Sequence, residues 1–412
     1  MKKPLIAILT LSLGLTSCAA TSTAQDAATP TSTSPAPSGE QPAGHGEIAG
    51  AQQVAEAPLH LLSIDQQGNA GLLDLLTEET TELMELGEVK STSSDGRYVF
   101  AETAQGLQIL DSGLWSWDHE DHFHYYKAEP QLIGTMTDAG PAKVSYPALS
   151  TAGHTGVYFP TDGAAVLLDN EALARGEISE TFRLEVGAKQ GGIVPLGDGA
   201  LVSAQGESGK PGTLSYYNAD GTSLPGTETT CSNPGAGTTT AAGTVIGCTE
   251  GALLATWDGE NPELALIDYP DQAQLGDDPV QFNQRKGRPA VAMADTKDGA
   301  WVLNVRTREW DQVFKGTAVE QVSAVGDTDG HVVAVDNSGR VLVQSTKDPQ
   351  INYSTAELEG GSGGQLMIDA ERAYLSAPES GVVYEIDFAD EARISRTLTP
   401  ATTPEHVQEV GR

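Results

Sequence analysis

Short apolar segments separated by turn-forming residues recur along the chain from about residue 56 onward. Each repeat begins with a turn such as Asp-Gly or Asn-Ser-Gly, continues with a strand of β-branched and aliphatic residues, and ends with a second turn and an alternating strand. SSDGRYVFAETAQGLQILD and DTDGHVVAVDNSGRVLVQS are two examples. Helical periodicity is nearly absent, and EALARGEI is the one short candidate. This pattern predicts an all-β protein.

The repeats indicate a β-propeller. About eight such units follow one another, and their spacing centres on roughly 40 to 50 residues, the period of four-stranded propeller blades. A two-sheet sandwich fits less well, because it does not repeat one hairpin signature around the whole chain. We expect a single propeller domain of seven or eight blades over residues 56–400, followed by a C-terminal tail over residues 401–412.

The N-terminus predicts export. MKKPLIAILTLSLGLTSC joins two lysines to an apolar run and ends like a bacterial lipobox, so residues 1–18 are expected to form a lipoprotein signal peptide with Cys18 as the lipidated residue. The alternative is an ordinary secretory peptide with an incidental cysteine. Residues 19–55 are rich in Ala, Ser, Thr and Pro and are expected to be a disordered tether. The mature protein would be lipid-anchored at the outer face of the cytoplasmic membrane, at the cell surface or in the periplasm.

Two further cysteines, Cys231 and Cys248, flank the turn-rich stretch SNPGAGTTTAAGTVIG. In an exported chain such a pair predicts a disulfide that closes a hairpin-like loop. The alternative is a pair of thiolate metal ligands, although neither cysteine has a cysteine or histidine close by in sequence.

The formal net charge of −34 limits the partners. Nucleic acid needs a basic surface, and anionic membrane surfaces are disfavoured for the same electrostatic reason. We therefore expect no nucleic-acid partner, contact with the membrane through the lipid anchor only, and a monomeric protein.

The segment WDHEDHFHYYK carries the strongest chemical signal. It places His119, His122 and His124 within six residues, in a chain with 8 histidines. In an extended strand His122 and His124 point to the same side, and a turn would bring His119 back to them. Three imidazoles with a carboxylate such as that of Asp121 suit tetrahedral zinc, and imidazole also suits copper and nickel. The alternative is a solvated polar loop whose histidines bond to the neighbouring acids.

This segment resembles a known family. The run DHEDHFHYYKAEPQLIGTMTDAGPAKV is similar to the D-H-x-D-H-x-H-Y-Y segment, followed by a Pro and a Gly-Thr, of the AztD-type zinc metallochaperones. The resemblance implies an exported β-propeller that holds zinc and passes it to the zinc-binding solute-binding protein of an ABC importer. It places His119, His122 and His124 in the metal region, with Asp118 and Asp121 as acidic neighbours.

Two departures from the family pattern bear on a second zinc site. Family members carry a His-rich segment near the mature N-terminus, where this chain has only His45, and a His-Gly-Glu after the first paired cysteine, where this chain has Asn233-Pro234-Gly235-Ala236. One tight zinc per chain is expected, with at most one weak accessory site that involves His45 or His154.

The remaining histidines occur singly in the sequence. His154, in STAGHTGVYF, falls in the next predicted blade and is retained as a candidate ligand, whereas His331, at the start of an apolar strand, is expected to be structural. His60 and His406 are not expected to bind metal. We expect no catalytic residues; the alternatives are a propeller lipoprotein that binds another protein, or a metal-dependent propeller hydrolase or lactonase.

Overall fold

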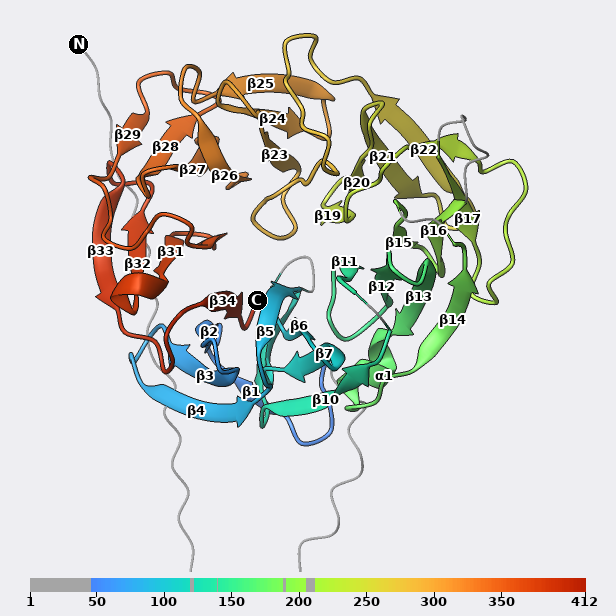
Figure 1. Ribbon diagram of the computed structural model, residues 1–412, viewed down its shortest axis with the longest axis horizontal. Coiled ribbons are helices and arrows are strands. Elements are labelled where there is room, and N and C mark those ends of the chain that lie inside the picture. Colours follow the sequence, from blue (N-terminus) through green and yellow to red (C-terminus); the bar gives the residue numbers. More distant parts are fainter. Residues whose placement is uncertain (1–45, 119–121, 139, 188–189, 205–211) are drawn as a thin grey trace, which may run out of the picture. The chain divides into compact units, whose positions relative to one another are not determined.

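The computed structural model describes residues 46–118, 122–138, 140–187, 190–204 and 212–412. Within these ranges the strands form nine antiparallel sheets, seven of four strands and two of three. Eight sheets are arranged as blades around a ring, and the ninth is an insertion in the second blade (Figure 1). The predicted β-propeller is confirmed, with eight blades.

The strands of the first four blades have the following bounds, in their order across each sheet: β34 (His406–Val410), β2 (His60–Ile64), β3 (Asn69–Asp74) and β4 (Thr80–Glu85); β5 (Val89–Ser94), β6 (Tyr98–Thr103), β7 (Gly106–Asp111) and β10 (Gln131–Met136); β11 (Lys143–Ser145), β12 (His154–Phe159), β13 (Ala164–Asp169) and β14 (Glu180–Glu185); β15 (Ile193–Leu196), β16 (Gly199–Ala204), β17 (Thr213–Tyr217) and β18 (Thr229–Thr230).

The strands of the other four blades are β19 (Thr238–Thr240), β20 (Gly243–Gly247), β21 (Ala252–Trp257) and β22 (Pro262–Ile267); β23 (Ala290–Ala294), β24 (Ala300–Asn304) and β25 (Glu309–Val313); β26 (Val319–Ala324), β27 (His331–Asp336), β28 (Val341–Ser345) and β29 (Asn352–Ser354); β30 (Leu366–Ile368), β31 (Ala373–Ala377), β32 (Val382–Asp387) and β33 (Arg393–Leu398). The helical segments described are α1 (Asn170–Ala174), which overlaps the first half of the predicted EALARGEI segment, and the 3-10 turn η1 (Pro378–Ser380).

The middle strands of the blades supply the core. Every residue of β27 and β31 is buried, whereas the outer strand β4 is largely exposed. Both faces of a middle strand pack against neighbouring blades, so these strands are mostly apolar, while the outer strand reaches solvent. One core cluster joins Phe100 of the second blade to Phe159 of the third.

Aspartates in the turns of the repeat have a structural role. Asp65 Oδ1 accepts hydrogen bonds of 2.9 Å from the backbone N–H groups of Gln67 and Asn69. Asp336 Oδ1 likewise accepts from Ser338 N (2.9 Å) and Arg340 N (3.0 Å). Such side-chain to backbone bonds fix tight turns, which explains why Asp recurs beside Gly between the strands.

The ring closes within the first blade. β34, from the C-terminal part of the chain, pairs antiparallel with β2, in a register that runs from His60 opposite Val410 to Ile64 opposite His406. The segment 401–412, expected from the sequence to be a tail, therefore contains a strand of the propeller. This segment is a strand because it pairs with β2, which is far away in sequence, and its own sequence pattern does not predict a strand.

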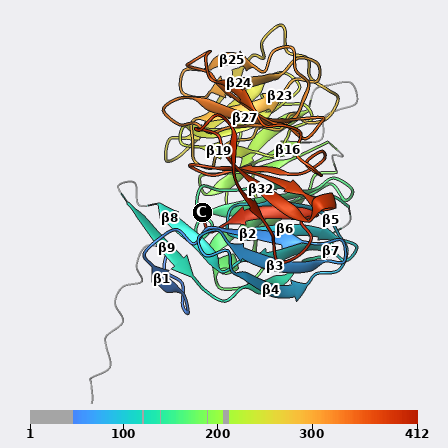
Figure 2. The same ribbon diagram turned by 90° about the vertical axis from the view of Figure 1, so that its left-hand side faces the viewer.

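The ninth sheet lies outside the blades. β8 (Leu114–Asp118) and β9 (Phe123–Lys127) form a hairpin between β7 and β10, and β1 (Gln52–Val54) pairs with the free edge of β9. Figure 2 shows this three-stranded sheet projecting from one face of the ring. β1 falls in the segment expected to be disordered tether, so the ordered part of the chain begins earlier than residue 56. Among the described residues no helix is both long and apolar enough to cross a membrane.

Cys231 and Cys248 form a disulfide, as the sequence predicts. Both are buried in a core cluster with Leu214 and Ile246. The bond closes a loop with a sequence separation of 17 and links the region after β18 to the turn between β20 and β21.

Replacing both cysteines with alanine is expected to lower the free energy of unfolding by about 3 kcal/mol, because a cross-link over a loop of this length restricts the unfolded chain. Urea unfolding followed by circular dichroism measures the loss. Zinc affinity should be retained in this variant; if all tight zinc binding disappeared with the cysteines while the protein stayed folded, the pair would have to take part in the metal site.

Candidate metal site on the β8–β9 hairpin

The inserted hairpin has two distinct faces. Trp117 is opposite His124 and Trp115 is opposite Tyr126 in the β8–β9 register, so these four side chains share one face. Tyr126 stacks on Trp115 with ring centroids 5.3 Å apart and faces the His124 ring at 6.4 Å. The opposite face carries Phe123, which is more than half exposed. The face of the hairpin that carries His124, here called the histidine face, therefore also carries the aromatic rings of Trp115, Trp117 and Tyr126.

His122 and His124 converge at the tip of this hairpin. Their Nε2 atoms are 3.0 Å apart, and their ring centroids are 4.7 Å apart with the planes at 66°. Nitrogen ligands 2.0–2.1 Å from a tetrahedral zinc ion lie about 3.3–3.4 Å from each other. A small opening of the pair would therefore give two ligands of one metal ion. His122 is exposed and His124 is half-buried, so the position between them is accessible.

The other predicted ligands of the histidine cluster, His119 and Asp121, lie outside the described residues, as do His45 and the lipidation candidate Cys18. The hairpin nevertheless fixes the chain on both sides of the turn, because Asp118 pairs with Phe123 as the last register pair. In the sequence, His119 and Asp121 lie between these two paired residues and precede His122.

A buried ion pair supports the base of the hairpin. Arg97 Nε and Nη2 donate to the two carboxylate oxygens of Asp111 at 2.9 and 2.6 Å, and both side chains are almost fully buried. The guanidinium carbon of Arg97 lies 4.0 Å from the ring centroid of Trp115, a cation–π contact. Asp111 Oδ1 also accepts from Gly113 N, at the bend where the hairpin begins. These buried contacts therefore fix the base of the hairpin that carries His122 and His124.

The chain N-terminal to β1 also contacts the histidine face. Gly46 O accepts a hydrogen bond of 2.9 Å from Trp115 Nε1. Gly46 has φ of 74°, and a Cβ atom there would come within 2.5 Å of the Trp117 ring, so both the conformation and the close approach require glycine. The predicted accessory ligand His45 is the covalent neighbour of this residue.

His154 occupies a different environment from the hairpin pair. It begins β12 opposite Asp169, its Nδ1 is buried without a hydrogen-bond partner, and the charged groups around it are Asp169, Asp198 and Glu171. Burial lowers the pKa of His154, and Asp169 offsets part of the shift. Within the described ranges no three-residue group of metal-binding side chains contains His154.

The histidines excluded by sequence reasoning have structural partners. His60 Nδ1 is 2.9 Å from Pro58 O, and its Nε2 is 3.5 Å from Asp74. His406 Nε2 is 3.1 Å from Val89 O. These contacts hold the two imidazoles within the propeller.

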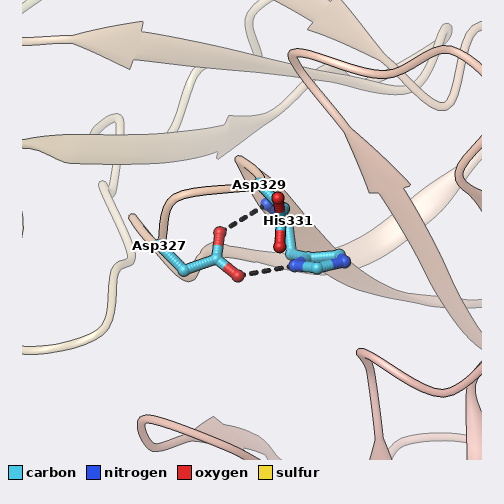
Figure 3. Close-up of side chains that lie close together, drawn as sticks. All are labelled: Asp327, Asp329 and His331. Atoms are coloured by element: carbon cyan, nitrogen blue, oxygen red, sulfur yellow. Dashed lines mark hydrogen bonds and ion pairs between the residues drawn. The ribbon is translucent and has the colours of Figure 1, made fainter. Parts of the chain in front are cut away.

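A second group of metal-binding type lies in the turn before β27. The candidate ligand atoms of Asp327, Asp329 and His331 all lie within 4.8 Å of one another (Figure 3). Sequence reasoning missed this group, although the spacing Asp-x-Asp-x-His in DTDGH would have revealed it. His331 is buried as expected, and its ring packs on Phe388 with centroids 5.5 Å apart.

The hydrogen bonds of this turn already account for its geometry. Asp327 Oδ1 accepts from His331 N at 2.9 Å, and Asp327 Oδ2 lies 2.5 Å from His331 Nδ1. The bond to Asp327 raises the pKa of His331; burial alone would raise the pKa of Asp327, but the bonds from His331 lower it. A proton on His331 Nδ1 occupies the place that a metal would need, so metal binding here must displace it.

Replacing His331 with glutamine is therefore expected to act on stability. The His331 contribution is complete below about pH 6.5 and is lost as pH rises through the raised folded pKa, and the Asp327 contribution is lost as pH falls below about 4. The variant should be less stable by about 2 kcal/mol near pH 5.5, with a smaller difference at pH 8.5. Urea unfolding at the two pH values measures this; an equal difference at both would contradict the ion pair.

A cavity in the propeller lies away from the histidine hairpin. Its volume is about 490 Å³, and it is lined by inner-strand residues such as Ser94, Gln321 and Gln408 and by Tyr146 and Lys286. Lys286 Nζ donates to Asp95 O at 2.6 Å. None of the described histidines lines this cavity, so it is separate from the metal candidates.

Comparison with known proteins supports the fold. No protein-family model matches the chain. The structure of apo AztD from Citrobacter koseri matches with a TM-score of 0.70 and 16% sequence identity, over 85% of this chain and 97% of that chain. A second crystal structure of Citrobacter koseri AztD matches with a TM-score of 0.69, also at 16% identity and over the same shares of the two chains. The chain therefore has an AztD-like β-propeller fold.

Proposed function

We propose that this protein binds zinc on the β8–β9 hairpin and delivers it to another zinc-binding protein outside the cytoplasm. The observation that carries the proposal is the convergence of His122 Nε2 and His124 Nε2, 3.0 Å apart, on a hairpin that projects from an AztD-like propeller. Two imidazole nitrogens at this separation match two corners of a tetrahedral zinc site.

The chemistry of the pair suits a donor of metal. Closed thiolate sites hold zinc in folded cores, whereas imidazole ligands at an exposed position leave room for a ligand from a second protein to enter. His122 is exposed at the end of the hairpin, and the two cysteines of the propeller are joined in a disulfide and therefore supply no thiolate. Zinc is the cargo in this proposal, and the chain performs no catalytic step.

Further ligands complete the site in this proposal. His119 and Asp121, which precede His122 in the sequence, supply the third and fourth ligands. His122 and His124 keep hold of the metal during transfer, and His119 is the first ligand to dissociate. The recipient is the zinc-binding solute-binding protein of an ABC importer, and the donor is exported and lipid-anchored through Cys18. The Asp327–Asp329–His331 group is at most a weaker accessory site, because its imidazole nitrogen is engaged by Asp327.

Metal analysis and transfer test this function. The purified protein should contain one tightly bound zinc ion per chain, measured by mass spectrometry of the metal and by competition with a chromophoric chelator. Mixed with the metal-free solute-binding protein of a zinc importer, it should lose zinc faster than it does to a chelator of equal affinity, because transfer requires contact. Absence of tightly bound zinc would contradict zinc storage. A transfer rate no faster than the loss of zinc to the chelator would contradict direct delivery.

A further inference from the structure

The short strand β1 brings a glutamine to the metal candidate. Gln53 is opposite Tyr126 in the β1–β9 register, so its side chain lies on the same face as Tyr126 and His124. Gln53 Nε2 is 3.1 Å from His124 Nδ1. The contact joins segments 71 residues apart in sequence and uses the imidazole nitrogen that does not face His122.

The contacts of His124 with Gln53 and His122 form a continuous hydrogen-bonded chain. In the orientation described, the Gln53 amide nitrogen donates to His124 Nδ1, which makes Nδ1 an acceptor and puts the proton of a neutral ring on Nε2. That Nε2–H then donates to His122 Nε2 over 3.0 Å. The metal-free pair is thus held with its two Nε2 atoms together by one proton.

Binding of metal reverses the requirement on Nδ1. When His124 Nε2 ligates a metal, its proton moves to Nδ1, which becomes a donor and needs an acceptor. A half-turn of the Gln53 amide exchanges nitrogen for Oε1 at the same position, with no change in the backbone. Glutamine serves both states, which neither a purely accepting nor a purely donating side chain does.

We propose that Gln53 is a positioning residue of the metal site, which orients the His124 ring and accepts its Nδ1 proton when Nε2 binds zinc. This inference rests on the proposed function. The inference also gives β1 a role. The strand pairs with the edge of β9, and this pairing brings Gln53 to the Nδ1 atom of His124. The tightness of zinc binding then depends on a strand that precedes the propeller.

Three variants test the role. Gln53→Leu removes both the donor and the acceptor of the side-chain amide. Zinc affinity should fall about 10- to 100-fold, which is the usual effect of removing the hydrogen-bonding partner of a metal-binding histidine. Gln53→Glu supplies a stronger acceptor for Nδ1–H and should bind zinc at least as tightly as the native protein. Gln52→Leu is the matched control, because Gln52 is the neighbouring residue of β1, is exposed and is opposite Lys127, on the other face.

Chelator competition gives the affinities, and nitrogen NMR of the His124 ring gives a measurement that a merely structural role would not change. In the metal-free native protein His124 should carry its proton on Nε2, and in the Gln53→Leu variant it should become a mixture of tautomers. Equal zinc affinity in the native, Gln53→Leu and Gln52→Leu proteins, or a Gln53→Glu variant as weak as Gln53→Leu, would overturn the inference. If the native protein bound no zinc through His122 and His124, the proposed function would fail instead.

Discussion

Replacing either His122 or His124 with alanine is expected to lower zinc affinity by more than about 100-fold. The loss of a hydrogen-bonding partner of a metal-binding histidine already costs 10- to 100-fold, and the loss of the ligand itself must exceed that. Each ring is half of the 3.0 Å pair, so neither can hold the metal in the same way alone. Competition with a chromophoric chelator at neutral pH, on folded protein checked by circular dichroism, measures the change.

The matched control is His331→Gln, which removes the imidazole of the Asp327–Asp329–His331 group and leaves the hairpin untouched. Its zinc affinity should equal that of the native protein. The reverse result, with zinc lost in His331→Gln and kept in both hairpin variants, would move the site to the turn before β27 and contradict the proposed function.

Replacing Asp111 with asparagine is expected to destabilise the protein by about 3–5 kcal/mol. The substitution removes the charge that compensates the buried guanidinium of Arg97, and an uncompensated buried charge costs this much. Both side chains are almost fully buried, and the rings of Trp115 and Tyr98 and the nearby carboxyl group of Asp95 compensate the charge of Arg97 only in part. The midpoint of urea unfolding measures the effect.

A surface pair of similar geometry provides the control. Arg393 Nε lies 2.6 Å from Asp390 Oδ2, the same separation as the closest contact of Arg97 with Asp111, but both side chains are more than half exposed. Asp390→Asn should cost much less than Asp111→Asn, because water and salt screen an exposed pair. Similar losses for the two variants would mean that burial does not govern the strength of the Arg97–Asp111 pair.

The architecture could be predicted from the sequence because the repeat leaves the same pattern in every blade. Middle strands such as β27 are apolar on both faces, and turns such as that of Asp336 carry the side chain that closes them. The disulfide was predictable from the predicted export of the chain and from the position of Cys231 and Cys248 on either side of a turn-rich stretch. These features depend on residues close together in the chain.

Features that depend on distant strands were not predictable. β1 (QQV) has no apolar pattern of its own, and it is a strand because β9 offers it a free backbone edge. β34 is a strand because β2 lacks an inner partner from its own segment. For the same reason the contact of Gln53 with His124 has no signal in either segment. The histidine pair was predictable because side chains alternate in extended chain, although His122 lies just before β9 and only His124 is within it.

The pairing of β34 with β2 also affects the order in which the blades fold. β2, β3 and β4 lead the propeller in chain order, yet their blade lacks its inner strand until β34 has been synthesised. Contacts between such distant segments raise the contact order and slow folding, because a long loop must close before they form. The first blade to leave the ribosome is therefore the last to be completed. We expect amide hydrogens on the β2 edge that faces β34 to gain protection from exchange last during refolding, after those of β27 and β31.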